Sequence, residues 1–305
     1  MWQARRRTFD LDALFGTEVI EALQSAFSPA FNLLFVFFTL LGEDYVYMSL
    51  IAVMYWCINK RGAVKTAYIL LACAYLNYWL KMSFKMDKPP SEYRIILKDD
   101  ISYGFPSGHM QNAVTFWGWL GFKSQKSWMH LLFLILISLI GLSRIYLGVH
   151  YFGDVLGGAL FGAVFLIGTY KTAPYLEDKL NSIPEGLRNY LTPLISVLLF
   201  GLSLAAFPDT TRGDSALICG TLFGFSLGVP LESKHVNISM AISRRTKTIR
   251  AVVGLMIVSG SYLMLSLILN SLSLNAQVFI GFLRYVIVAF AITLITPSIF
   301  KFIER

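Results

Sequence analysis

The chain reads WMHLLFLILISLIGLSRIYLGVHYFGDVLGGALFGAVFLIGTY from Trp128 to Tyr170. This stretch contains two apolar runs, at about residues 128–143 and 147–170, with a short polar segment between them. A helix that crosses a bilayer needs about 20 predominantly apolar residues, so each run is close to the length of one span. The polar segment then bridges two neighbouring spans at one face of a membrane.

The composition of the whole chain also indicates a membrane protein. Of its 305 residues, 56% are hydrophobic and 14% are charged, against about 45–50% and about 25% in an average soluble domain. The net charge is +8, but Lys and Arg stand in short clusters between apolar blocks and are not interleaved with aromatic residues, so we expect no nucleic-acid partner. Cys57, Cys73 and Cys219 lie in apolar stretches without CxxC spacing, which predicts neither a disulfide framework nor a zinc site.

Ten apolar segments predict an all-α, polytopic membrane protein. They lie at about residues 28–42, 45–58, 63–84, 107–122, 128–143, 147–170, 190–207, 214–230, 250–270 and 276–300. The first two segments are counted as separate spans, because Glu43 and Asp44 between them would be unfavourable at the centre of a bilayer.

These segments divide the chain into four parts. Residues 1–26 are expected to form an amphipathic segment on the membrane surface, since apolar residues recur at helical spacing. We expect a six-span core at 27–170, a polar cytoplasmic linker at 171–189, and a four-span C-terminal unit at 190–305.

The distribution of Lys and Arg predicts the orientation of the spans. With a cytoplasmic N-terminus, 18 of the 26 cationic residues fall on the inner side and 7 on the outer side, while Arg284 lies within the last span. Both termini are therefore predicted to be cytoplasmic. The same alternation brings three polar stretches to the extracytoplasmic or lumenal face. They are Lys81–Pro89 (KMSFKMDKP), Pro106–His109 (PSGH) and Ser143–Asp154 (SRIYLGVHYFGD).

In the third stretch, His150 and Asp154 are four residues apart at the expected start of the sixth span. This spacing puts them on one face of a helix, one turn apart. The carboxylate can hold one imidazole nitrogen and leave the other free to attack or to accept a proton. The alternative is a pair that only satisfies its own hydrogen bonds at the start of a helix.

In the second stretch, Pro106 and Ser107 are typical of a helix start. The first backbone N–H groups of a helix have no internal partner and can bind an anion. Ser107 would add a hydroxyl, Gly108 would let the backbone approach closely, and His109 would stand beside the anion. The alternative is an ordinary capped helix.

Three cations complete the set, Lys81, Lys88 and Arg144. A phosphate group would neutralise them, with Arg able to bind in a bidentate manner. The alternative is that their charged ends only reach out to the membrane interface. Asn77, one helical turn before Lys81, is a possible supporting residue, and so is Ser143.

Together the three stretches resemble the tripartite signature of the type 2 phosphatidic acid phosphatase and vanadium haloperoxidase superfamily. Its pattern is K-x6-R-P, then P-S-G-H, then S-R-x5-H-x3-D. Every position matches except that Lys88 stands where the pattern has Arg. The resemblance covers about residues 27–170 and leaves the four C-terminal segments outside it.

The resemblance implies a two-step phosphatase that uses neither a metal nor another cofactor. His150 would attack phosphorus, Asp154 would orient His150, and His109 would protonate the leaving alcohol and then activate water. The groups implied to hold the phosphate oxygens are Lys81, Lys88, Ser107, the Gly108 N–H and Arg144.

The expected function is therefore that of a membrane phosphatase acting on a phosphorylated lipid of the phosphatidate, sphingoid-base phosphate or polyprenyl diphosphate type. Three alternatives stay open: a sugar-phosphate phosphatase like the membrane glucose-6-phosphatases, a phosphotransferase, and a non-catalytic lipid-phosphate transporter or binder. The expected partners are the bilayer and the lipid, and the oligomeric state is left open. Glu43 and Asp44 are expected to form a solvated turn, and Arg284 to reach toward the membrane surface.

Overall fold

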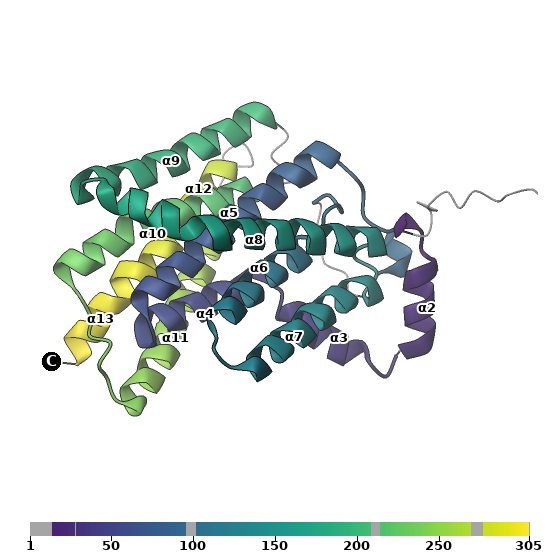
Figure 1. Cartoon of the computed structure of the whole chain (residues 1–305), viewed down its shortest axis with the longest axis horizontal. Helices are drawn as coiled ribbons and strands as arrows, with labels where there is room; N and C mark the ends of the chain where they lie inside the picture. Colours follow the sequence, from purple (N-terminus) through teal and green to yellow (C-terminus); the bar gives the residue numbers. More distant parts are fainter. Residues whose placement is uncertain (1–13, 28, 96–101, 209–213, 270–276, 305) are drawn as a thin grey trace, which may run out of the picture. The chain divides into compact units, whose positions relative to one another are not determined.

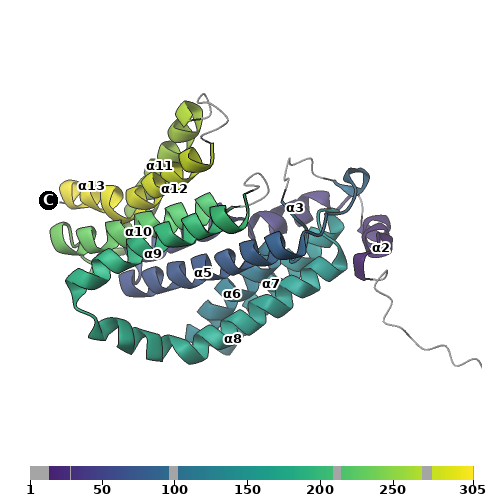
Figure 2. The same cartoon turned by 90° about the horizontal axis from the view of Figure 1, so that it is seen from above.

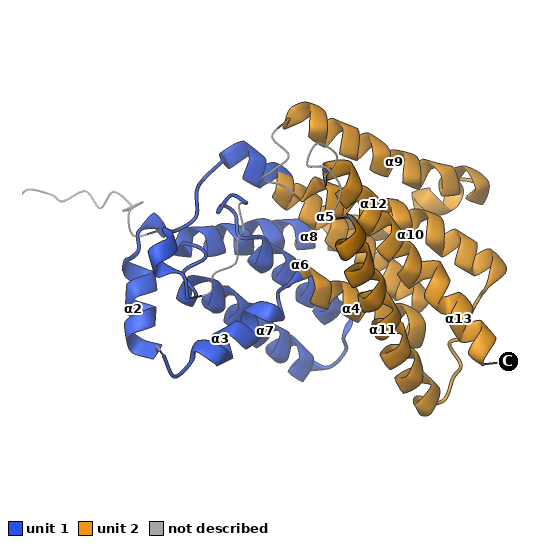
Figure 3. Cartoon of the chain, turned by 180° about the vertical axis from the view of Figure 1, so that it is seen from behind, with its two compact units in different colours: residues 1–43, 79–166 blue, residues 44–78, 167–305 orange. Residues whose placement is uncertain are grey.

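A computed structural model describes residues 14–27, 29–95, 102–208, 214–269 and 277–304. These residues form helices and no strand, so the predicted all-α class is confirmed. Contacts divide the chain into two compact units (Figure 3). Unit 1 comprises residues 1–43 and 79–166, and unit 2 comprises residues 44–78 and 167–305.

Unit 1 is built from α2 (Glu18–Phe27), α3 (Asn32–Leu40), the end of α5 (Lys60–Phe84), η1 (Ser91–Tyr93), α6 (Gly108–Lys123), α7 (Ser127–Tyr146) and the first half of α8 (Phe152–Ser182). Unit 2 is built from α4 (Asp44–Cys57), most of α5, the second half of α8, α9 (Glu185–Ala206), α10 (Ser215–His235), α11 (Arg244–Leu269), α12 (Gln277–Phe290), the π-helical η4 (Ala291–Ile295) and α13 (Thr296–Ile303). The contacts therefore divide the chain differently from the predicted boundary at 171–189.

In the part of the chain that the structure describes, six helices are long and apolar enough to cross a membrane. Four of them are α9, α10, α11 and the continuous helix from α12 to α13, which correspond to the four predicted C-terminal spans. The other two are α7 and α8. α6 has only 16 residues, and the polar residues Lys65 and Asn77 lower the mean hydropathy of α5.

The first two predicted segments form two helices, α3 and α4, separated by a break at Leu41–Glu43. The helices differ in direction by 51° and qualify as a membrane span only when taken together. α3 has nine residues, or about 14 Å at 1.5 Å per residue, against about 30 Å for the hydrocarbon core of a bilayer. α3 is therefore too short to be the separate full span that the sequence predicted.

The N-terminal helix α2 lies beside the end of α7 and the start of α8 (Figure 1). Ile20 of α2 packs on Ile145 and Val155, and Gln24 Nε2 donates to the Tyr93 and Tyr146 carbonyl oxygens at 2.8 Å each. The sequence-based topology placed the N-terminal segment opposite the three polar stretches. These contacts correct it: residues 14–27 lie at the same end of unit 1 as the α7–α8 connection. Residues 1–13 lie outside the described ranges.

The α7–α8 connection in unit 1 depends on one glycine. Gly148 has a φ of +67°, a conformation that other residues rarely adopt. A Cβ at this position would also collide with the Tyr93 carbonyl oxygen. The turn therefore packs directly on the segment that follows α5.

The predicted linker at 171–189 is mostly helical. α8 continues through Pro174 to Ser182, and α9 begins at Glu185, so only residues 183–184 separate them. The mixed charges in this region lie on the end of α8 and the start of α9.

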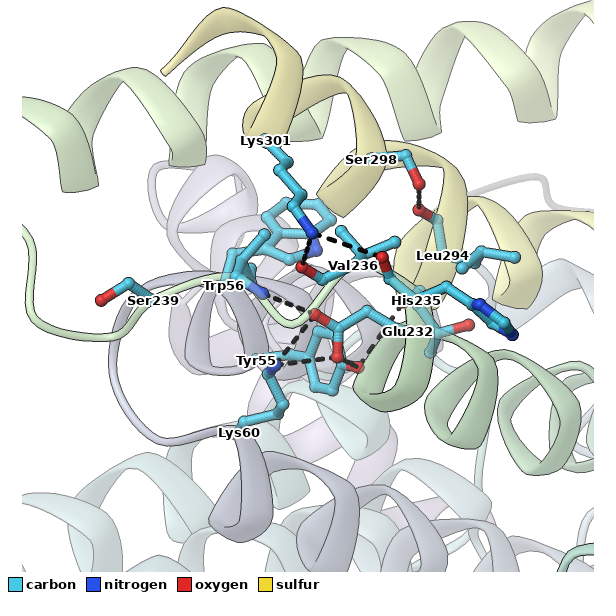
Figure 4. Close-up of polar contacts among 12 residues, drawn as sticks. Tyr55, Trp56, Lys60, Glu232, His235, Val236, Ser239, Leu294, Ser298 and Lys301 are labelled. Carbon is cyan, nitrogen blue, oxygen red and sulfur yellow. Dashed lines mark hydrogen bonds and ion pairs between the residues drawn. The ribbon is translucent and has the colours of Figure 1, made fainter. Parts of the chain in front are cut away.

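Unit 2 is held together by buried polar contacts (Figure 4). The Glu232 carboxylate of α10 accepts hydrogen bonds from Lys60 Nζ at 2.8 and 2.9 Å and from the Tyr55 hydroxyl at 3.1 Å. Trp56 Nε1 donates to the Ile292 carbonyl oxygen in the π-helical turn at 2.8 Å. Within the same unit, α9 and α10 run side by side (Figure 2).

Candidate active site

The three polar stretches meet in unit 1, as the sequence predicted. Lys81 lies in the last turn of α5, and Lys88 lies in the segment that follows it. Ser107 is the N-cap of α6, and Arg144 lies in the last turn of α7. A backbone hydrogen bond from Ser107 N to the Asp154 carbonyl oxygen, at 2.9 Å, joins the second stretch to the third.

His150 and Asp154 form the predicted contact, but with a different local geometry. His150 lies in the turn before α8, and Asp154 lies in the first turn of that helix. The two residues are therefore not stacked on one helical face. His150 Nδ1 is 3.1 Å from Asp154 Oδ2, which also accepts the Tyr151 backbone N–H at 3.0 Å. With Asp154 ionised, we assign the proton to Nδ1, so Nε2 keeps its lone pair.

The surroundings of His150 favour the neutral imidazole. The side chain is 2% exposed and its aspartate partner is completely buried. Burial, together with the positive charges of Arg144, Lys81 and Lys88, lowers the pKa of His150 well below its usual value. A neutral imidazole is the form that can act as a nucleophile.

Ser107 supplies a buried hydroxyl at the start of α6. The residue is completely buried. Its side chain makes no capping hydrogen bond, and its Oγ has no hydrogen-bond partner among the described residues. Buried polar groups in proteins nearly always have a partner. An unsatisfied hydroxyl beside the first N–H groups of a 16-residue helix is expected where an anion binds.

Lys81 and Lys88 converge on the same hydroxyl group. Lys81 Nζ donates to Ser102 Oγ at 3.2 Å, and Lys88 Nζ donates to it at 3.0 Å. Two ammonium groups on one neutral oxygen create a region of positive charge that an anion would stabilise.

Arg144 and His109 are contacted by the end of α3 and by the break that follows it. Arg144 is 6% exposed, and its Nη1 donates to Thr39 Oγ1 at 2.6 Å. His109 Nε2 lies 3.4 Å from Glu43 Oε1. Sequence reasoning assigned no role to Thr39 and treated Glu43 as part of a solvated turn.

The structure does not bring every predicted residue to the site. Ser143 is buried within α7 and donates to the Ile140 carbonyl oxygen at 2.7 Å, so its hydroxyl is used inside its own helix. Asn77 is buried in α5, one turn before Lys81, and its role as a supporting residue stays a prediction. Ser102, Thr39 and Glu43 were missed. For Glu43, a carboxylate between two unusually short apolar segments was the one available signal.

No group of three or more His, Cys, Asp and Glu side chains in the described ranges has the spacing to hold a metal ion. The site instead offers three cations, a buried hydroxyl and a helix N-terminus, which suit a tetrahedral anion such as phosphate. Beside them stand an imidazole with a free Nε2 and a second histidine. This set can combine anion binding with nucleophilic attack and proton transfer.

Comparison with known proteins agrees with this geometry. Residues 62–178 match the PAP2 superfamily, and residues 216–304 match the PAP2 superfamily phosphatase, transmembrane extension. The dihydrosphingosine 1-phosphate phosphatase of Schizosaccharomyces pombe is 28% identical over 70% of this chain and 55% of its own length. The sphingosine-1-phosphate phosphatase 2 of Mus musculus is 26% identical over 64% of this chain and 57% of its own length. The chain thus spans little more than half the length of these relatives.

Among solved structures, the transmembrane PAP2 type phosphatidylglycerolphosphate phosphatase from Bacillus subtilis is similar to 52% of this chain and 84% of its own, with 22% identity and a TM-score of 0.47. A score below 0.5 does not establish a shared fold, so the assignment rests on the sequence matches. The chain therefore carries a PAP2 superfamily domain at residues 62–178 and the PAP2 transmembrane extension at residues 216–304.

Proposed function

We propose that this protein is an integral membrane phosphatase that hydrolyses the phosphate ester of a lipid. The observation that carries the proposal is the His150–Asp154 pair, buried beside Arg144, Lys81 and Lys88. A site that only bound phosphate would need the cations but not a nucleophile whose tautomer is set by a carboxylate.

In the first step, the Nε2 lone pair of His150 forms a bond to phosphorus as the ester P–O bond breaks. The bonding electrons pass to the leaving oxygen, which takes a proton from the His109 imidazolium. Asp154 stabilises the positive charge that develops on His150. The product alcohol leaves, and the phosphoryl group stays on His150.

In the second step, the His109 imidazole accepts a proton from water as the water oxygen attacks phosphorus. The N–P bond breaks, and its electron pair returns to His150 Nε2. Lys81, Lys88, Arg144 and the Ser107 hydroxyl stabilise the phosphoryl oxygens in both steps.

A lipid substrate is supported by the setting of the site and by the relatives. Helices of membrane-spanning length flank the site within unit 1. The relatives named above are phosphatases of sphingosine-type phosphates. We therefore propose a sphingoid-base phosphate as the first substrate to test, with phosphatidate and polyprenyl diphosphate as comparisons.

We further propose that the site faces the extracytoplasmic or lumenal side. The excess of Lys and Arg on the other side of the spans supports this orientation. α2 packs at the end of unit 1 that holds the site, so we place the N-terminal helix on the same side as the site. α3 and α4 are then counted as one broken span. When Arg5, Arg6 and Arg7 are counted on the outer side, the inner side still holds 15 cations and the outer side holds 10. The C-terminus stays on the cytoplasmic side.

The experiment is phosphate release by the purified protein in detergent, with a chelator present. The panel contains sphingosine 1-phosphate, phosphatidate, a polyprenyl diphosphate and glucose 6-phosphate. We expect release from at least one lipid in preference to the sugar phosphate. Preference for glucose 6-phosphate would favour the sugar phosphatase, and phosphate binding without release from any substrate would contradict an enzyme.

A further inference from the structure

Residues 39–43 comprise the last two residues of α3 and the break before α4. They lie outside the three stretches of the phosphatase signature. Nevertheless they contact the candidate site twice. Thr39 Oγ1 accepts a hydrogen bond from Arg144 at 2.6 Å, and Glu43 Oε1 lies 3.4 Å from His109 Nε2. We call residues 39–43 the junction segment.

We propose that Glu43 is a positioning residue for His109, held in place by the break between α3 and α4. The Glu43 carboxylate faces Nε2 of His109 and fixes the ring, and Nδ1 carries the proton that moves to and from the substrate. This inference rests on the proposed function, because it gives Glu43 a part in the proton transfer assigned to His109.

The burial of Nε2 supports this division of labour. The His109 side chain keeps 20% of its surface exposed, but Nε2 itself is buried and has no aligned hydrogen bond among the described residues. Glu43 Oε1 lies 3.4 Å from Nε2, and the Glu43 side chain is 15% exposed. The accessible part of the ring is therefore the part that Glu43 does not face.

Charge gives the carboxylate a second effect. Burial disfavours the His109 imidazolium that must donate a proton, and the positive charges of Arg144 and Lys81 add to this effect. Glu43 is the carboxylate that faces the same ring and favours the imidazolium. Without Glu43, these cations would leave less of His109 in the imidazolium form that donates the proton.

Packing at Gly42 holds the junction segment against the ring. A Cβ at this position would lie 3.1 Å from His109 Cδ2 and 2.8 Å from Ile140 Cγ2. A side chain at this position would have to displace Ile140 or His109. The break between α3 and α4 therefore places the Glu43 carboxylate beside His109.

The kinetic test compares two substrates that differ in their need for an acid. In an alkyl phosphate the leaving alkoxide must be protonated, whereas p-nitrophenolate leaves without a proton. We expect Glu43→Ala to lower kcat/KM about 10- to 100-fold for the alkyl phosphate and less than about threefold for p-nitrophenyl phosphate. The ratio kcat/KM is used because it reports phosphoryl transfer to the enzyme and not the later hydrolysis.

Three further variants sharpen the test. Glu43→Asp should recover part of the loss, and Glu43→Ala in a His109→Ala background should add less than about twofold. Glu21→Gln is the matched control, because Glu21 is an exposed carboxylate of α2 in the same unit. Equal losses for both substrates, or fully additive losses in the double variant, would overturn the positioning role.

A measurement that does not use turnover separates this inference from the proposed function. The chain has only four histidines, so ¹⁵N labelling can follow each imidazole by NMR in detergent. We expect Nε2 of His109 to carry a proton in the wild type and Glu43→Gln to shift the His109 signals while His150 changes little. Unchanged His109 signals would overturn the inference even if phosphate is released. Shifted signals without hydrolysis would keep the contact and reject the enzyme.

Discussion

Two buried polar clusters in this protein differ in how completely their hydrogen-bonding groups are used. In unit 2, the Glu232 carboxylate is completely buried, and it accepts hydrogen bonds from Lys60, Tyr55 and the Ile238 backbone N–H. Arg250, which is 1% exposed, binds Glu304 and the Trp56 carbonyl oxygen. Each buried charge has an opposite charge and further hydrogen bonds.

In unit 1, by contrast, the described part of the site gathers Lys81, Lys88 and Arg144 around polar atoms that lack a hydrogen-bond partner. Lys81 and Lys88 share one hydroxyl, and the buried hydroxyl of Ser107 has no partner among the described residues. A satisfied network such as that around Glu232 stabilises a fold. Buried polar groups without a partner are expected where a ligand completes the set. The difference between the clusters therefore predicts which substitutions will affect activity and which will affect stability.

The largest effect is expected at the nucleophile. We expect His150→Ala to lower kcat about 10,000-fold or more, because no other side chain can replace its Nε2. Thermal unfolding in detergent should change little. Residual activity within tenfold of the wild type, measured by phosphate release, would remove His150 from its role.

The next effect should fall on stability. Glu232→Ala leaves Lys60 without its carboxylate, and removing one partner of a buried pair costs about 3–5 kcal/mol. Denaturation in detergent should show this loss, and the specific activity of the folded fraction should be retained. If Glu232→Ala leaves stability unchanged while abolishing turnover, the division between the two clusters is wrong.

A smaller effect on activity is expected at Ser107. Its hydroxyl has no partner among the described residues, so Ser107→Ala should change the free energy of unfolding by less than about 0.5 kcal/mol. It should lower kcat/KM about 10- to 100-fold, since one donor to the transition state disappears. Ser143→Ala is the matched control, because the Ser143 hydroxyl is used within its helix. Equal losses in both variants would contradict an anion site at α6.

At Thr39, we expect a loss of affinity for the anion. Thr39→Val keeps the shape of the side chain but removes the oxygen that accepts a hydrogen bond from Arg144 at 2.6 Å. Binding of orthovanadate should weaken about 3- to 10-fold, in line with the value of a hydrogen bond to a charged group. Unchanged vanadate affinity would mean that Arg144 is positioned without Thr39.

The smallest effect is expected in the pH dependence of kcat/KM. Burial and the neighbouring cations lower the pKa of His150, so the neutral nucleophile persists at pH values where an ordinary histidine, with a pKa of about 6.5, would be protonated. The acidic limb of kcat/KM assigned to this residue should therefore lie below pH 6.5. An acidic limb above pH 7 that remains when other titratable residues of the site are replaced would contradict a neutral, buried nucleophile.

The three stretches of the site were predictable because their spacing is local information. The spacing of His150 and Asp154 suggested a contact that is present, although a turn and not a shared helical face produces it. The four C-terminal spans were also predictable, since each is a long apolar segment without interruption.

The contribution of α3 and α4 was not predictable in the same way. Hydropathy shows that a segment is apolar but not whether the helix is long enough to cross the membrane alone. The contacts of Thr39 with Arg144 and of Glu43 with His109 join residues 105 and 66 positions apart. Such contacts depend on how helices pack, and one sequence carries no direct record of them.

Direct detection of the phosphoryl group on His150 is the measurement that tests this account most closely. His109→Ala protein should be mixed with p-nitrophenyl phosphate labelled with ³²P, since this leaving group needs no acid and the second step is slowed. After an alkaline quench, the account predicts one label per site, stable in base and lost in acid, that mass spectrometry places on His150. Turnover without any labelled histidine, or a label on another residue, would contradict the mechanism.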